Sequence, residues 1–66
     1  MRYTFTKGHH RVEISQTAKG GYEITDFGYL TVRDSWTRQG TWLVSMETGQ
    51  EVMNRLERKG YAVGRR

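Results

Sequence analysis

Residues 29–61 read YLTVRDSWTRQGTWLVSMETGQEVMNRLERKGY, and the rest of the chain is best understood around this segment. Apolar and polar residues alternate over 29–33, and β-branched and aromatic residues are concentrated over 41–46. Both stretches are therefore predicted to be β-strands. The residues between them, 34–40, are polar and end in glycine, which favours a loop.

The strongest helical signal follows, over 49–59. Thr48 and Glu51 have the spacing of a capping box, in which the Thr hydroxyl accepts from the Glu N–H and the Glu carboxylate reaches back to the Thr N–H. Gly60 lies where a left-handed residue commonly ends a helix. A helix of about eleven residues is marginal alone, so its apolar stripe must be buried against a sheet. That stripe consists of Val52, Met53 and Leu56.

The N-terminal part of the chain predicts more sheet. Side chains alternate over 2–6, 11–17 and 22–26, and glycine-containing turns separate these strands. The residues 26–28, Asp-Phe-Gly, are predicted to turn the chain into the strand over 29–33.

Short strands joined by short turns favour an antiparallel meander. We therefore predict one small α+β domain over 1–66, with four to five strands, one C-terminal helix on one face of the sheet, and a short edge strand over 61–63. The residues expected on the covered face are Phe5, Val12, Ile14, Tyr22, Ile24, Leu30, Val32 and either Trp42 with Val44 or Leu43.

Length and composition limit the classes of function. The 66-residue chain has no cysteine, which excludes disulfides and thiolate metal sites. No apolar run approaches the roughly 18 residues of a membrane span, so we expect no membrane association and a cytoplasmic location. No serine has a patterned base and acid, and so small a meander leaves little room for a cleft. We therefore expect no enzyme, no cofactor and no small-molecule substrate.

The net charge of +4 arises entirely in the last twelve residues. Residues 1–54 contain six basic and six acidic groups, whereas residues 55–66 contain five basic groups and one acidic group. Basic residues at a helix C-terminus interact favourably with the helix dipole, which explains part of this pattern without a partner. A phosphate backbone or an acidic protein surface would also offset their mutual repulsion. The basic groups are Arg55, Arg58, Lys59, Arg65 and Arg66.

Trp36 and Arg38, in the predicted loop, form a second candidate contact. A tryptophan beside an arginine can stack on a nucleobase or anchor a protein interface, and the alternative is that Trp36 folds back as a lid on a small core. His9 and His10 are adjacent, and adjacent residues of a strand point to opposite faces. They are therefore predicted to lie in a solvated turn rather than to bind a metal.

The sequence thus favours a small, basic, non-catalytic regulatory module. It is expected to act on nucleic acid or a nucleoprotein assembly through the basic end of its helix, as a monomer or weak dimer. The alternative is a stoichiometric protein–protein adaptor or inhibitor that uses exposed aromatics as anchors and the basic tail to steer association. A third interpretation is a structural subunit that self-assembles through an edge strand.

Overall fold

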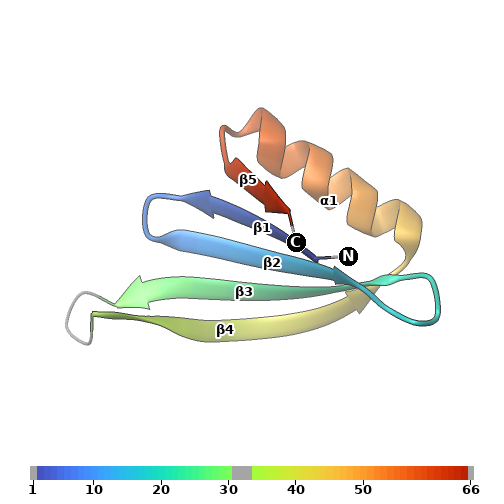
Figure 1. Ribbon diagram of the computed structural model, residues 1–66, viewed down its shortest axis with the longest axis horizontal. Coiled ribbons are helices and arrows are strands. Elements are labelled where there is room, and N and C mark those ends of the chain that lie inside the picture. Colours follow the sequence, from blue (N-terminus) through green and yellow to red (C-terminus); the bar gives the residue numbers. More distant parts are fainter. Residues whose placement is uncertain (1, 31–33, 66) are drawn as a thin grey trace.

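A computed structural model describes residues 2–30 and 34–65 (Figure 1). In these residues, five strands form one antiparallel sheet, and a single helix packs on one face of it. The elements are β1 (Arg2–Lys7), β2 (His10–Gln16), β3 (Tyr22–Leu30), β4 (Ser35–Val44), α1 (Met46–Arg58) and β5 (Ala62–Arg65). The predicted α+β meander with a covering helix is confirmed.

The strand order is β4-β3-β2-β1-β5, so the first four strands follow one another as hairpins. Helix α1 then carries the chain from the β4 edge to the opposite edge, where β5 pairs antiparallel with β1. Strand β5 corresponds to the short edge strand expected over 61–63. In the β2–β3 hairpin, Thr17 and Gly21 hydrogen bond across the turn, and Gly20 has a φ of +90°, which glycine adopts without strain.

Strands β3 and β4 are longer than the sequence predicts. The predicted turn at 26–28 is wrong, because β3 continues through it, and the predicted loop over 34–40 is wrong, because β4 begins at Ser35. The two strands stay paired across a β-bulge. Asp26 is opposite Gly40 but Phe27 is opposite Arg38, so Gln39 is the extra residue.

Glycine at position 28 marks a close approach within the sheet rather than a turn. A Cβ at Gly28 would overlap the side-chain amide of Gln39, which lies over it. The first two residues of the strand predicted over 29–33 are therefore the last two residues of β3. The later residues of that predicted strand, 31–33, lie outside the described residues, and so does the core position predicted for Val32.

The core lies between α1 and the covered face of β1–β3. Its buried side chains are Phe5, Val12, Ile14, Tyr22 and Ile24, all of which the alternation predicts. Val52, Met53 and Leu56 of α1 pack against them, so the predicted helical stripe is confirmed. Val44 also packs on this cluster, while Leu43 points to the other face. The alternative that places Trp42 with Val44 on the covered face is therefore correct, although Trp42 itself stays half-exposed.

Helix α1 begins three residues before the predicted start. Ser45 is the N-cap, and its Oγ accepts from the backbone N–H of Thr48 at 3.2 Å, so the capping box predicted at Thr48 is wrong. Ser45 has extended backbone dihedrals at the end of β4, which places it where a cap is needed. The predicted end is confirmed, since Gly60 has a φ of +90° and the N–H of Tyr61 donates to the carbonyl of Leu56. No helix in residues 2–30 and 34–65 is long and apolar enough to cross a membrane.

Candidate functional site

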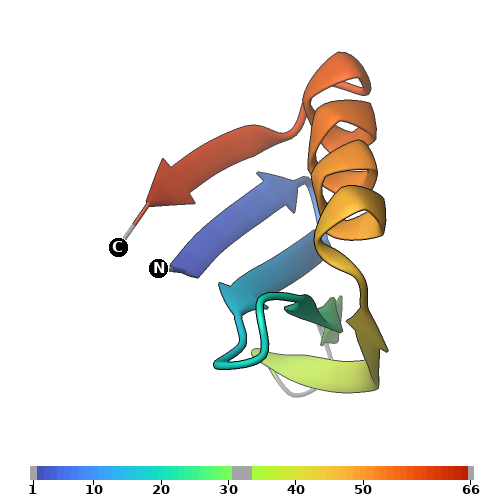
Figure 2. The same cartoon turned by 90° about the vertical axis from the view of Figure 1, so that its right-hand side faces the viewer.

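The face of the sheet opposite α1 is left uncovered by the described part of the chain (Figure 2). Because side chains alternate along a strand, this open face carries the residues between the core positions. The register aligns them in rows across β1–β4. One row consists of Thr4, Glu13, Thr25 and Thr41, and the next consists of Thr6, Arg11, Phe27 and Arg38. The open face is therefore rich in hydroxyl groups, arginines and aromatic rings.

Five side chains on or beside this face contact one another and form what we call the open-face cluster. The guanidinium carbon of Arg11 lies 4.6 Å from the ring centre of Phe27 and 4.9 Å from that of Trp36. The rings of Tyr29 and Trp36 meet edge-on with their centres 5.3 Å apart, and the ring centres of His9 and Tyr29 are 5.4 Å apart. The members come from the β1–β2 turn, β2, β3 and β4. Segments far apart in the sequence thus converge on one patch.

Arg11 is the centre of the open-face cluster. Its two aromatic neighbours each provide a cation–π contact, worth about 0.5–2 kcal/mol, and restrain the guanidinium. Its Nη2 lies 3.3 Å from the Glu13 carboxylate, and its buried Nε has no hydrogen-bond partner among the described residues. The guanidinium is therefore held in place before any partner arrives, which lowers the entropic cost of binding.

Trp36 and Arg38 both belong to this face. Trp36 lies on β4 and packs against Arg11 and Tyr29, on the side of the sheet away from the core, so it is not a lid on the core. Arg38 is exposed beside Phe27 in the neighbouring row. The sequence predicts these two residues as a pair. It does not indicate that Arg11, Phe27 and Tyr29 join them.

The basic end of α1 is a separate patch. Arg55, Arg58 and Lys59 are exposed there, and Lys7 of β1 joins them, since its Nζ donates to the carbonyl of Lys59 at 2.5 Å. Lys7 also lies 5.8 Å from the ring centre of Tyr61. The sequence alone does not place Lys7 here, because only the pairing of β5 with β1 brings Lys7 close to the end of α1.

The position of Arg65 follows from the pairing of β5 with β1. Arg65 pairs with Tyr3, whereas Ala62, at the start of β5, pairs with Thr6. The backbone of Arg65 therefore lies at the far end of β5 from the helix terminus. Arg66 lies outside the described residues. The backbone of Arg65 is thus separated from Arg55, Arg58 and Lys59 by the length of β5.

The solvated turn predicted for His9 and His10 is confirmed for His9, which is exposed in the β1–β2 turn, and is wrong for His10, which is the first residue of β2 and partly buried. His9 contacts Tyr29 in the open-face cluster. On the helix side, His10 Nδ1 lies 2.6 Å from the Tyr61 hydroxyl, and its Nε2 pairs with the Asp26 carboxylate. This network ties the segment after α1 to β2 and β3. Within residues 2–30 and 34–65, no group of three or more His, Cys, Asp or Glu side chains is arranged to hold a metal.

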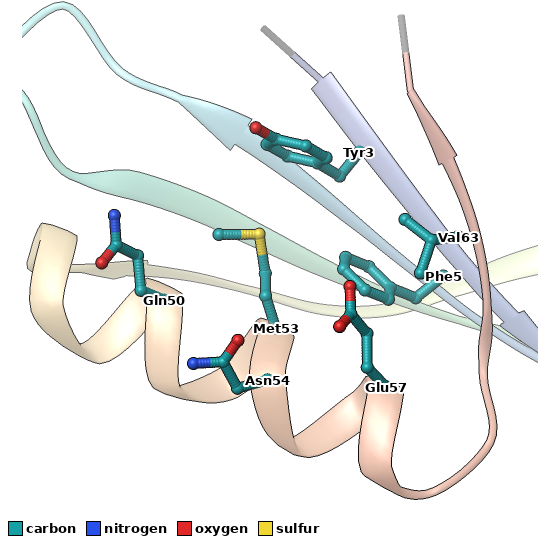
Figure 3. Close-up of a pocket in the computed structure, with 7 residues that line it drawn as sticks. All are labelled: Tyr3, Phe5, Gln50, Met53, Asn54, Glu57 and Val63. Atoms are coloured by element: carbon teal, nitrogen blue, oxygen red, sulfur yellow. The ribbon is translucent and has the colours of Figure 1, made fainter.

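A groove runs between α1 and the β1–β5 edge of the sheet (Figure 3). Its volume is about 210 Å³, below the roughly 300–1,000 Å³ of a typical ligand pocket. Phe5, Met53 and Val63 are its apolar lining, and Glu57 points into its mouth. The open-face cluster, with its converging cation and rings, is the stronger candidate.

Comparisons with protein-family models, curated proteins and solved structures find no match to this chain, so the function is argued from the geometry of the open face.

Proposed function

We propose that the chain is a small, non-catalytic module that binds single-stranded nucleic acid through the open face of its sheet. The observation that carries this proposal is the open-face cluster, in which the Arg11 guanidinium contacts the rings of both Phe27 and Trp36. Aromatic rings beside arginines on a surface suit unpaired bases, since every base has a flat face and every nucleotide carries a phosphate.

A single strand fits this surface better than a duplex. In a duplex the base faces are already stacked on one another, and only groove edges and phosphates remain accessible. The partly exposed rings of Phe27, Tyr29 and Trp36 would then contribute little. Hydroxyl groups of Thr25 and Thr41 lie next to the cluster and supply hydrogen bonds to sugar or phosphate.

The net charge supports the same proposal. The excess of +4 attracts a polyanion at long range, and the exposed group of Lys7, Arg55, Arg58 and Lys59 is the second contact we propose. In this arrangement the basic end of α1 increases the rate of encounter, and the open-face cluster determines where the strand lies.

The test is the binding of a labelled mixed-sequence oligonucleotide, single-stranded and duplex, at low and moderate salt. We expect the single strand to bind more tightly, with affinity that falls as salt rises. Trp36→Ala should weaken binding by about 1–3 kcal/mol, the usual contribution of one base-stacking ring, whereas Trp36→Phe should retain most of the affinity.

Two substitutions that each remove one positive charge distinguish a local contact at Arg11 from general attraction to a basic surface. Arg11→Gln and Lys19→Gln each remove one positive charge, but Lys19 is in the β2–β3 hairpin, at the other end of β2. We expect a large loss for Arg11→Gln and a small one for Lys19→Gln. Equal losses would mean that binding is non-specific attraction to a basic surface.

Two other outcomes would indicate a different binding surface or a different partner. If Arg11→Gln and Trp36→Ala are neutral while the triple change of Arg55, Arg58 and Lys59 to Gln abolishes binding, the contact is the basic end of α1 alone. If neither oligonucleotide binds, the nucleic-acid proposal is wrong. The adaptor interpretation would then take its place, because Trp, Tyr and Arg are also the residues that dominate protein interfaces.

A further inference from the structure

The two edges of the sheet differ in length and in the way they are protected. The β5 edge has four residues, Ala62–Arg65, whereas the β4 edge has ten, Ser35–Val44. The outer side of β4 has no strand beside it in the described part of the chain. An unpaired edge of this length is a template for pairing with another strand unless it is blunted.

Only the first half of β4 is protected against pairing with another strand. The bulge at Gln39 interrupts the regular edge, and Arg38 places a charge beside it. The second half, residues 40–44, reads GTWLV and contains neither a charge nor a proline. Trp42 is 52% exposed on the helix side of this segment, and Leu43 is 75% exposed on the open face. Both faces of the unguarded half therefore carry a large apolar side chain in water.

We propose that residues 40–44 of β4 pair antiparallel with the same residues of a second copy of this chain, about a two-fold axis at Trp42. In this register the two Trp42 side chains face each other on the helix side. On the open face, Thr41 of each copy faces Leu43 of the other. Arg38 falls beyond the paired segment, so no like charges oppose each other.

The local structure suits a contact of this kind. The Trp42 ring lies over Gly40, where an added Cβ would be 2.8 Å from the ring, so the indole is held against the strand beside the edge. Beyond Leu43 the surface continues into a shallow hollow of about 500 Å³ at the end of the sheet. Its lining consists of Thr17, Ala18, Lys19, Tyr22, Leu43, Val44 and Ser45.

The pairing would join the two sheets into one, with equivalent faces of the two copies on the same side. A two-fold axis perpendicular to the sheet keeps both α1 helices on one side and both open-face clusters on the other. A dimer would therefore present two copies of the open-face cluster on one continuous surface. The inference itself depends only on the β4 edge and holds whether or not the open face binds nucleic acid.

Because the chain has no cysteine, single-cysteine variants can test the register directly. Trp42→Cys should form a disulfide with itself under mild oxidation, since residues opposite each other across strands have Cβ atoms about 4.5–5.5 Å apart. Thr41→Cys and Leu43→Cys should cross-link when mixed and not when alone. Ser35→Cys, on the guarded half of β4, is the control and should form no disulfide between copies under the same oxidation.

The mass of the cysteine-free parent in solution, measured by sedimentation over a range of concentrations, completes the test. We expect a mass of two copies that falls to one on dilution. Leu43→Lys should raise the dimer dissociation constant on the order of tenfold or more, because the substitution occurs at both symmetric contacts. Trp36→Ala, on the same strand outside the paired segment, should leave the constant unchanged.

Several results would overturn the inference. A parent that stays monomeric up to about 1 mM excludes a dimer of useful affinity. A dimer in which Ser35→Cys cross-links as readily as Trp42→Cys, or which Leu43→Lys leaves intact, is formed by another surface. If the parent forms the dimer but binds no oligonucleotide, the proposed function is wrong and this inference stands. If the parent binds the oligonucleotide but stays monomeric, this inference is wrong and the proposed function stands.

Discussion

Substitution of Gly49 by alanine should destabilise the protein, although the same change stabilises most helices. Gly49 lies in the first turns of α1 and is its one fully buried residue. An added Cβ would lie 2.8 Å from Cγ and 3.0 Å from Cβ of Tyr22, and closer still to Cδ2. Tyr22 is only 7% exposed, and its backbone is paired in the sheet with Gln16 and Val44, so the Cβ end of its side chain cannot withdraw.

Two effects of opposite sign determine the size of the change. Alanine is better than glycine in a helix by about 1 kcal/mol. Inserting a methyl group into a packed contact costs about 1–3 kcal/mol, and more where the neighbour is rigid. Because the Tyr22 Cβ is fixed to the sheet backbone, we expect the packing cost to win. The net loss should be about 1–2 kcal/mol, which lowers the Tm of so small a domain by roughly 5–15 °C.

Thermal unfolding followed by circular dichroism measures this loss. Asn54→Ala is the matched control, because Asn54 is exposed in the same helix and gains helix propensity without a new contact. The control should have an equal or higher Tm than the parent. A Gly49→Ala protein that is also more stable than the parent would show that α1 does not rest on Tyr22.

Two further predictions concern stability. Ser45→Ala should cost about 1 kcal/mol because it removes the N-cap acceptor of α1, whereas Thr48→Ala should cost much less, and a comparison of melting midpoints distinguishes the two caps. Ile14→Ala should cost about 2–5 kcal/mol because Ile14 is fully buried, and Leu56→Ala should cost less because Leu56 is only partly buried; urea unfolding checks their order.

The parts of the fold that the sequence predicts are those set by local patterns. Alternation predicts each buried sheet residue whose burial the structure describes, because a strand with one covered face must place an apolar side chain at every second position. The stripe of Val52, Met53 and Leu56 and the stop at Gly60 are equally local. The start of α1 was misjudged because Thr48 and Glu51 have the spacing of a capping box, while Ser45 already occupied the cap.

The parts of the fold that the sequence does not predict depend on pairing between strands. Residues 34–40 are polar and resemble a loop, but residues 35–40 become strand because β3 offers them a partner along its whole length. Strand propensity is a weak guide in such a segment, since burial and cross-strand contacts determine the outcome. The glycine at 28 resembles a turn signal for a similar reason, since only the pairing of β3 with β4 shows that it lies inside a strand.

The β-bulge connects these errors to the candidate site. With no extra residue at Gln39, Trp36 would lie opposite Leu30 and share the helix side of the sheet, because a shift of one residue moves a side chain to the other face. The bulge instead places Trp36 opposite Tyr29, on the same face as Arg11. A single unpaired residue thus brings a tryptophan from β4 onto an arginine from β2. It also divides the β4 edge into a guarded half beside the open-face cluster and an unguarded half at Trp42. The surface proposed to bind nucleic acid and the edge proposed to bind a second copy therefore depend on the same local irregularity.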